Sequence, residues 1–215
     1  MTDKISRYRK MLQSLAGLGD EHAKKITSNR YKLMYHYFVR CVSLTSGIIL
    51  LVEAENLTGA YALEKSLVDA LLGGLYFGYV APDKEVEETI AMALKGRGTG
   101  HSNMRKRARM IDAELSRRRT FMTGMFNNTV TRSSELLNEF GHGGLLSTAL
   151  ATKHPFPPEF ADGVLSVSAI SVIAFLGNVF VLENLDLAPL EAALKEFQSI
   201  NQRLGSALGA KTNGQ

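Results

Sequence analysis

The sequence predicts an all-α protein, a single-domain antiparallel helical bundle with short flanking helices. Three observations favour this fold class. Apolar residues recur at helical spacing along most of the 215-residue chain. Alternating apolar and polar runs bounded by Asn-Gly or Asp-Gly turns are absent, which argues against strands. The composition, 45% hydrophobic and 21% charged, is that of an ordinary globular chain with a core.

Eight helices are expected, joined by short loops that allow the long ones to lie antiparallel. They cover about residues 3–16, 20–54, 58–80, 82–94, 103–119, 121–140, 158–184 and 189–204. Together they make one domain over residues 1–204, and residues 205–215 read as a disordered tail.

In the first half of the chain, helix ends are indicated by short-range signals. Gly17 and Gly19 suit the end of the first helix, because glycine is the usual residue just beyond a helix. Thr58 is a candidate N-cap of the third helix, and Pro82 suits the first turn of the fourth. The second helix is indicated by an apolar stripe at Leu33, Tyr37, Val39, Leu44, Ile48, Leu51 and Val52.

In the second half of the chain, the helices are predicted from the spacing of apolar residues and from one long uncharged run. The helix over 103–119 has Met104, Ala108, Ile111 and Leu115 at helical spacing. The helix over 121–140 stops at Gly141. The last helix has Leu190, Leu194, Phe197 and Leu204 on or near one face.

Val164 to Leu182 contains no charge, so its length makes it a candidate membrane span. The segment also carries serines, a glycine and Asn178, and Ser171 lies seven residues before Asn178 on the same helical face. We expect a buried helix of a soluble bundle and no membrane span. A membrane-associated protein anchored by this segment is the alternative.

A ladder of small residues runs along the third helix at intervals of four: Ser66, Ala70, Gly74 and Gly78. Glycine in a helix costs about 1 kcal/mol relative to alanine, and a close helix crossing would offset that loss. The partner is either another helix of this chain or the same helix in a second copy, and we expect a homodimer.

The residue types present limit which compartment and which cofactors can be expected for the protein. The single cysteine, Cys41, excludes an internal disulfide and fits a reducing compartment. The N-terminus is polar and charged, unlike a secretory signal peptide, so a cytoplasmic location is expected. No Cys/His set has zinc spacing, and the glycine-rich stretch at 96–101 lacks the phosphate-binding pattern. Neither a metal nor a cofactor is expected.

Basic residues are concentrated in one region. Residues 95–119 hold nine basic and two acidic side chains, a net charge of +7, whereas the rest of the chain carries −3. A local basic patch suggests a polyanionic partner such as RNA, although a merely solvated helix face is the alternative. The candidate nucleic-acid-binding residues are Arg105, Lys106, Arg107, Arg109, Arg117, Arg118 and Arg119.

Lys65 and Asp69 lie four apart on one face of the third helix, among apolar neighbours. A carboxylate in such company is often partly buried and needs a partner. Two interpretations stay open. The pair is either a structural ion pair or part of a polar site inside the bundle.

His142 stands among three glycines, directly after the expected helix that contains Asn138 and Glu139. Histidine suits general acid–base catalysis because its unperturbed pKa lies near neutrality. The residue is either a turn histidine or a catalytic residue working with Glu139 or Asn138.

Two stretches resemble a bacterial family of uncharacterised helical proteins. ALEKSLVDALLGGLYFGYVAPDKEVE resembles its landmark helix, apolar stretch and turn into an acidic helix, and LNEFGHGGLL resembles its His-Gly-Gly landmark. The resemblance runs from about Tyr31 to Leu182. It implies that Lys65 and Asp69 stand where the family has arginine and glutamate, and that His142 stands at the family histidine.

This family is similar in outline to the HEPN superfamily, whose members are helical, usually dimeric, and in several cases RNases of toxin–antitoxin and phage-defence systems. The resemblance therefore implies a HEPN-like bundle and a metal-independent RNase or RNA-binding protein. The arginine-to-histidine spacing of the HEPN nuclease motif is absent, because Arg132 is too far from His142 and Arg97 too near His101. A non-catalytic module that binds a partner protein or a small ligand is the alternative.

Overall fold

The computed structural model describes residues 2–96, 103–118, 126–127 and 158–201. In these residues it has seven helices and no strand, so the predicted all-helical bundle is confirmed there. The helices are α1 (Thr2–Ala23), α2 (Asn29–Glu53), α3 (Leu57–Tyr79), α4 (Asp83–Leu94), α5 (Met104–Arg117), α8 (Pro158–Leu182) and α9 (Ala188–Ile200). The expected helix over 121–140, apart from residues 126–127, and the tail lie outside the described residues.

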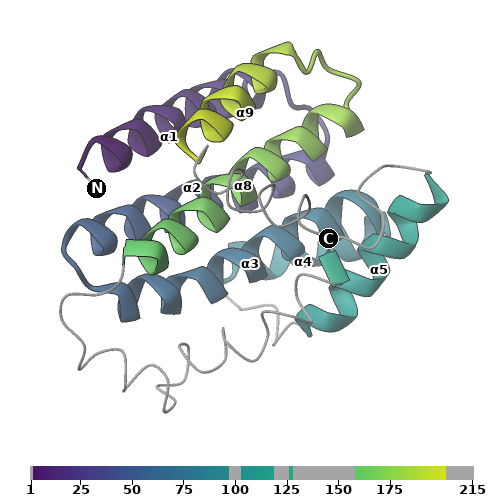
Figure 1. Cartoon of the computed structure of the whole chain (residues 1–215). Helices are drawn as coiled ribbons and strands as arrows, with labels where there is room; N and C mark the ends of the chain where they lie inside the picture. Colours follow the sequence, from purple (N-terminus) through teal and green to yellow (C-terminus); the bar gives the residue numbers. More distant parts are fainter. Residues whose placement is uncertain (1, 97–102, 119–125, 128–157, 202–215) are drawn as a thin grey trace, which may run out of the picture.

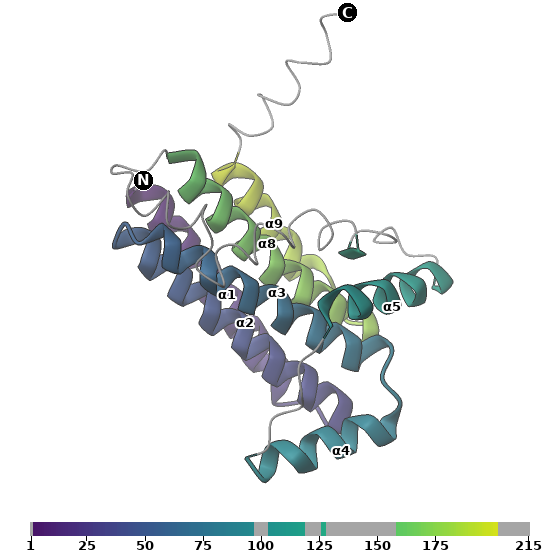
Figure 2. The same cartoon turned by 90° about the horizontal axis from the view of Figure 1, so that it is seen from below.

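Helices α1, α2, α3 and α8 form the bundle, and α9 packs against α1 and α8 (Figure 1). Successive helices α1, α2 and α3 alternate in direction, whereas α8 runs parallel to α3. Tyr61 donates a hydrogen bond to the Phe160 carbonyl near the start of both helices, and Tyr79 donates to Asn178 near their ends. Outside the bundle, α4 lies against α2 and α5 against α3 (Figure 2).

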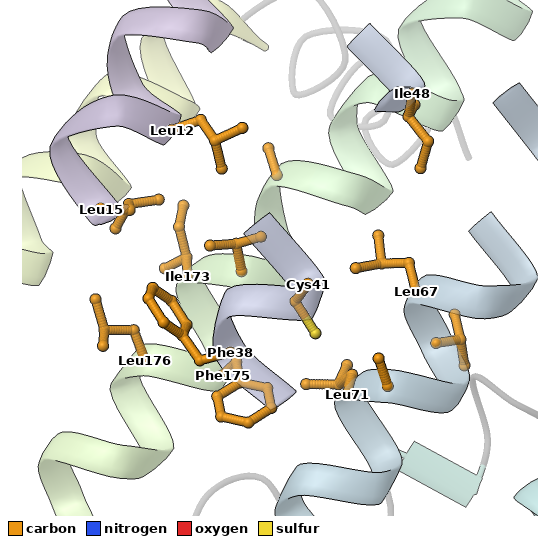
Figure 3. Close-up of a cluster of buried hydrophobic side chains, with 14 of the residues drawn as sticks. Leu12, Leu15, Phe38, Cys41, Ile48, Leu67, Leu71, Ile173, Phe175 and Leu176 are labelled. Atoms are coloured by element: carbon orange, nitrogen blue, oxygen red, sulfur yellow. The ribbon is translucent and has the colours of Figure 1, made fainter. Parts of the chain in front are cut away.

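The core between these helices is apolar. Figure 3 shows Phe38 and Cys41 of α2, Leu67 and Leu71 of α3, and Phe175 of α8 within one cluster. Cys41 has no exposed surface, and burial raises the pKa of its thiol to about 12. The only cysteine of the chain is therefore an inert core residue.

Two glycines of the small-residue ladder let side chains of α2 and α8 approach the α3 backbone. A Cβ at Gly74 would lie 2.3 Å from Cζ of Phe175, and one at Gly78 would lie 2.5 Å from Sδ of Met34. At these two positions the space beside the glycines is filled by side chains of the same chain and not by another helix backbone. The homodimer stays a prediction.

The first helix is longer than the sequence predicts, since α1 continues through Gly17 and Gly19 to Ala23. Gly19 is a packing residue and not a helix end, because a Cβ there would lie 2.2 Å from Cε1 of Phe38. The second helix correspondingly begins only at Asn29.

Side-chain caps fix where the long helices start and stop. Oδ1 of Asn56 accepts a hydrogen bond from the Gly59 amide at 2.9 Å, so Asn56 caps α3 in the place expected for Thr58. At the other end of α3, Arg30 donates to the carbonyls of Phe77 and Ala81 and pairs with Asp83 at 2.6 Å. One arginine thus joins the start of α2 to the end of α3 and the start of α4.

Within the described residues, α2 and α8 are long and apolar enough to cross a membrane by length and composition. In the most apolar window of α8, 67% of the residues are buried inside the bundle, against 33% in that of α2. Such burial is typical of the core helix of a soluble protein. The absence of a membrane span stays a prediction.

The Gly74 contact can be tested by substitution. Gly74→Ala places a methyl group against the buried Phe175 ring, so we expect a loss of about 1–3 kcal/mol in the free energy of unfolding. Gly17→Ala is the matched control, because nothing lies within 4 Å of a Cβ at Gly17 and alanine raises helix stability by about 1 kcal/mol. Urea unfolding of both variants measures the difference, and equal stability would contradict the packing role of Gly74.

Candidate functional site

Lys65 and Asp69 lie on one side of α3, and both side chains are half-buried. Each of them has a polar or charge interaction in the structure. Asp69 is also near enough to the phenol of Tyr37 on α2 for its charge to contribute to the raised pKa of that group. Of the predicted pair, Asp69 is thus placed within electrostatic reach of a residue of α2.

Helix α5 packs against α3 with its apolar side, and one buried carboxylate joins α5 to residues 126–127. Ala108, Ile111 and Leu115 are fully or almost fully buried. Asp112, also buried, accepts hydrogen bonds from the amides of Phe126, at 3.2 Å, and Asn127, at 2.6 Å. These contacts leave the opposite side of the helix to solvent.

Two of the predicted RNA-binding arginines have aromatic contacts within the fold. The guanidinium of Arg107 lies over the rings of Tyr76, at 5.3 Å, and Phe77, at 5.9 Å. The guanidinium of Arg118 lies over the ring of Tyr79 at 5.1 Å. These cation–π contacts join α5 to the second half of α3.

Glu114 neutralises much of the charge at the end of α5. Its carboxylate accepts hydrogen bonds from Arg117, at 2.7 and 2.8 Å, and from Arg118, at 2.8 Å. These bonds, first that from Arg117, lower the pKa of Glu114 to about 2. Glu114 therefore stays ionised and paired at any physiological pH.

The remaining predicted basic residues of α5 point to solvent. Arg105, Lys106 and Arg109 are exposed. The side chains of Lys106 and Arg109 form no hydrogen bond or ion pair with the described residues, whereas Arg105 has a partner. We call these three residues the exposed basic face of α5. Arg119, like Asn138, Glu139 and His142, lies outside the described part of the chain, so those predictions stay untested.

The sequence reasoning missed Glu64, the most buried carboxylate of α3. Only 7% of Glu64 is exposed, and burial raises its pKa from 4.5 to about 7. Because Leu63 lies against Gly47 and α8 runs parallel to α3, Glu64 is level with residues 46–48 of α2 and about 163–168 of α8. Neither stretch holds a charged residue. A signal was available, since Glu64 follows Tyr61 and precedes Leu67 at helical spacing.

Tyr37 is a second residue that the sequence does not mark as part of a site, because its spacing predicts only a place in the apolar stripe of α2. Its ring stacks on that of Phe77 at 5.7 Å, and burial raises the pKa of its phenol. Among the described side chains, no group of three or more histidines, cysteines and carboxylates lies together that could hold a metal ion.

Comparison with known families gives a match over most of the chain. The model of a family of unknown function, DUF6988, matches residues 40–202, which include α3, α5 and α8. No curated protein and no solved structure was found to match the chain. The HEPN relationship and the His-Gly-Gly landmark stay predictions.

The buried carboxyl of Glu64 should make stability depend on pH. Its pKa is higher in the fold than the ordinary 4.5, so the folded state favours the protonated form. That contribution is complete below about pH 4.5 and is lost as the pH rises through 7, a total of about 3 kcal/mol. We expect Glu64→Gln to abolish this loss in urea unfolding at pH 5 and pH 8. The exposed Glu87→Gln should keep the wild-type pH dependence, and an unchanged profile in Glu64→Gln would rule out the assignment.

Proposed function

Because the chain belongs to DUF6988, a family of unknown function, its activity has to be argued from its own residues, and we propose that it binds RNA through the exposed basic face of α5. The observation that carries this proposal is that both acidic residues of the basic region, Asp112 and Glu114, already have partners within the fold. Asp112 is one of the buried residues of α5 and accepts from two amides, and Glu114 pairs with Arg117 and Arg118. Neither acid opposes the exposed basic face.

The chemistry of this face favours contacts with phosphates over contacts with bases. Lys106 and Arg109 have no partner among the described residues, so their charges are available to a polyanion. Binding of phosphates by such side chains releases counterions and falls steeply with salt. No aromatic residue stands between Met104 and Arg117, so base stacking is not part of the interface. The face suits binding with little sequence preference.

We further propose that bound RNA is cleaved without a metal ion, with His142 as the acid–base group and Glu139 or Asn138 as its partner. Support comes from residue chemistry, since histidine can exchange a proton at neutral pH, and from the resemblance to HEPN proteins. A cytoplasmic homodimer in a bacterial defence or toxin–antitoxin system is the setting in which this activity fits.

The RNA-binding role can be tested with paired charge deletions. Lys106→Ala/Arg109→Ala should weaken binding of a single-stranded RNA about tenfold at low salt, and should flatten the slope of log Kd against log salt by about 1.4, or 0.7 for each lost phosphate contact. Fluorescence anisotropy measures both quantities. Lys10→Ala/Lys195→Ala removes two exposed charges from α1 and α9 and should change neither. Equal effects of the two double variants would exclude the face as the binding surface.

Catalysis has a separate test, an RNA cleavage assay with EDTA present. We expect wild-type protein to cleave and His142→Ala to be slower by at least about a hundredfold, the usual contribution of a general acid or base. His154→Ala serves as the matched control, and circular dichroism checks that all three proteins are equally helical. No cleavage by wild type would sink the nuclease proposal and leave a non-catalytic binding module.

A further inference from the structure

Arg107 is separated from the exposed basic face and is held in a fixed position. It is half-buried, and its guanidinium lies over the rings of Tyr76 and Phe77. A guanidinium has five N–H donors, yet no described residue accepts a hydrogen bond from the guanidinium of Arg107 or forms an ion pair with it. An arginine that is already ordered by its neighbours loses little entropy when it binds an anion.

Tyr37 lies against the same aromatic ring as Arg107. Its ring stacks on Phe77 at 5.7 Å with an interplanar angle of 28°. Gly73 makes room for it, because a Cβ at that position would lie 2.7 Å from Cε1 of Tyr37. Its hydroxyl forms no hydrogen bond with the described residues. Burial raises the pKa of the phenol, so the hydroxyl of Tyr37 stays protonated and can donate a hydrogen bond.

Arg40 completes the group from α2. It is one helical turn after Tyr37, so the two residues share a side of the helix. Arg40 is exposed and makes no ion pair with any described residue. The charges of both Arg107 and Arg40 reach the Tyr37 phenol, because each opposes the rise in its pKa. Arg40 from α2 and Arg107 from α5 therefore both act on the hydroxyl of Tyr37, and Arg107 and Tyr37 share contact with the Phe77 ring.

The nearby acids do not occupy these donors. Asp69 also acts on the Tyr37 phenol, in the opposite direction to the arginines, and it has a partner in the structure. The carboxylate of Glu85 on α4 accepts a hydrogen bond from the Tyr76 hydroxyl at 3.0 Å. Asp69 has a partner of its own and Glu85 accepts from Tyr76, whereas the side chains of Arg40, Arg107 and Tyr37 form no hydrogen bond or ion pair with the described residues.

We propose that Tyr37, Arg40 and Arg107 form a binding site for one terminal phosphate group, a phosphomonoester. Two guanidinium groups match the double negative charge of a phosphomonoester, and each offers paired N–H donors for two of its oxygens. The Tyr37 hydroxyl donates to a third oxygen. Such a group occurs at the 5′ end of an RNA and on a mononucleotide. The RNA source rests on the function proposed above, whereas the mononucleotide source does not.

The experiment uses variants that keep the fold. Arg107→Lys retains the charge and removes the planar fork, and Tyr37→Phe removes only the hydroxyl while the ring remains to stack. Arg118→Lys is the matched control, because Arg118 also lies over an aromatic ring of α3 but donates to Glu114. Isothermal titration with adenosine 5′-monophosphate and with adenosine measures whether the phosphate is recognised.

We expect wild type to bind the monophosphate and not adenosine. Arg107→Lys should bind it at least about tenfold more weakly, the effect of losing hydrogen bonds to a charged group. Tyr37→Phe should lose severalfold in affinity, and Arg118→Lys should bind as wild type does. No binding by wild type, or equal binding by Arg107→Lys and wild type, would overturn the site.

A second arm identifies the source of the phosphate. An RNA oligonucleotide with a 5′-phosphate is compared with the same RNA ending in a 5′-hydroxyl. An advantage of the phosphorylated RNA that Arg107→Lys abolishes supports the site at an RNA end, and monophosphate binding without that advantage supports a free nucleotide. Loss of RNA binding in Lys106→Ala/Arg109→Ala with intact monophosphate binding separates the exposed basic face from this site. Monophosphate binding that persists when wild type binds no RNA would refute the proposed function alone.

Discussion

The structure depends on how closely side chains of α2 and α8 approach the backbone of α3. Phe175 and Met34 occupy the space that a Cβ would take at Gly74 and Gly78. This arrangement makes α3 the centre of the molecule, with α2, α8 and α5 packed on different sides of it (Figure 1). A helix so enclosed has little surface for polar groups, which explains why its charged residues are either buried, as Glu64 is, or gathered on one side.

Some arginines stabilise the fold through contacts with other residues, whereas others are exposed to solvent. Arg30 satisfies carbonyls at the end of α3, where a helix leaves its last acceptors unpaired. Arg107 and Arg118 join α5 to aromatic rings of α3. The number of basic residues in the sequence does not show which of them anchor a helix and which are exposed. The basic region of the sequence thus contains both anchors of α5 and residues that are available to a partner.

The sequence predicts more of the fold than of the candidate site. Helical spacing and the uncharged run identified every described helix, because these signals are local. The end of α1 was wrong, because Gly19 serves a contact with Phe38 that no local pattern contains. The sequence singled out Asp69 for its apolar neighbours, yet adjacent residues of a helix point in different directions, and Glu64 is the buried acid. Tyr37 was missed as a site residue because its neighbours come from three helices. Asn138, Glu139 and His142 lie outside the described residues, so the catalytic half of the prediction is still to be tested.

The buried thiol of Cys41 has a practical consequence for spectroscopy. A thiol without exposed surface and with a pKa of about 12 reacts slowly with maleimides and methanethiosulfonates. The native chain therefore supplies an unreactive background, and a single cysteine introduced at an exposed position such as Ser116 can be labelled without replacing Cys41. A spin label placed on α5 in this way would report the distance between two copies if the protein assembles, and a second introduced cysteine would give distances within one molecule.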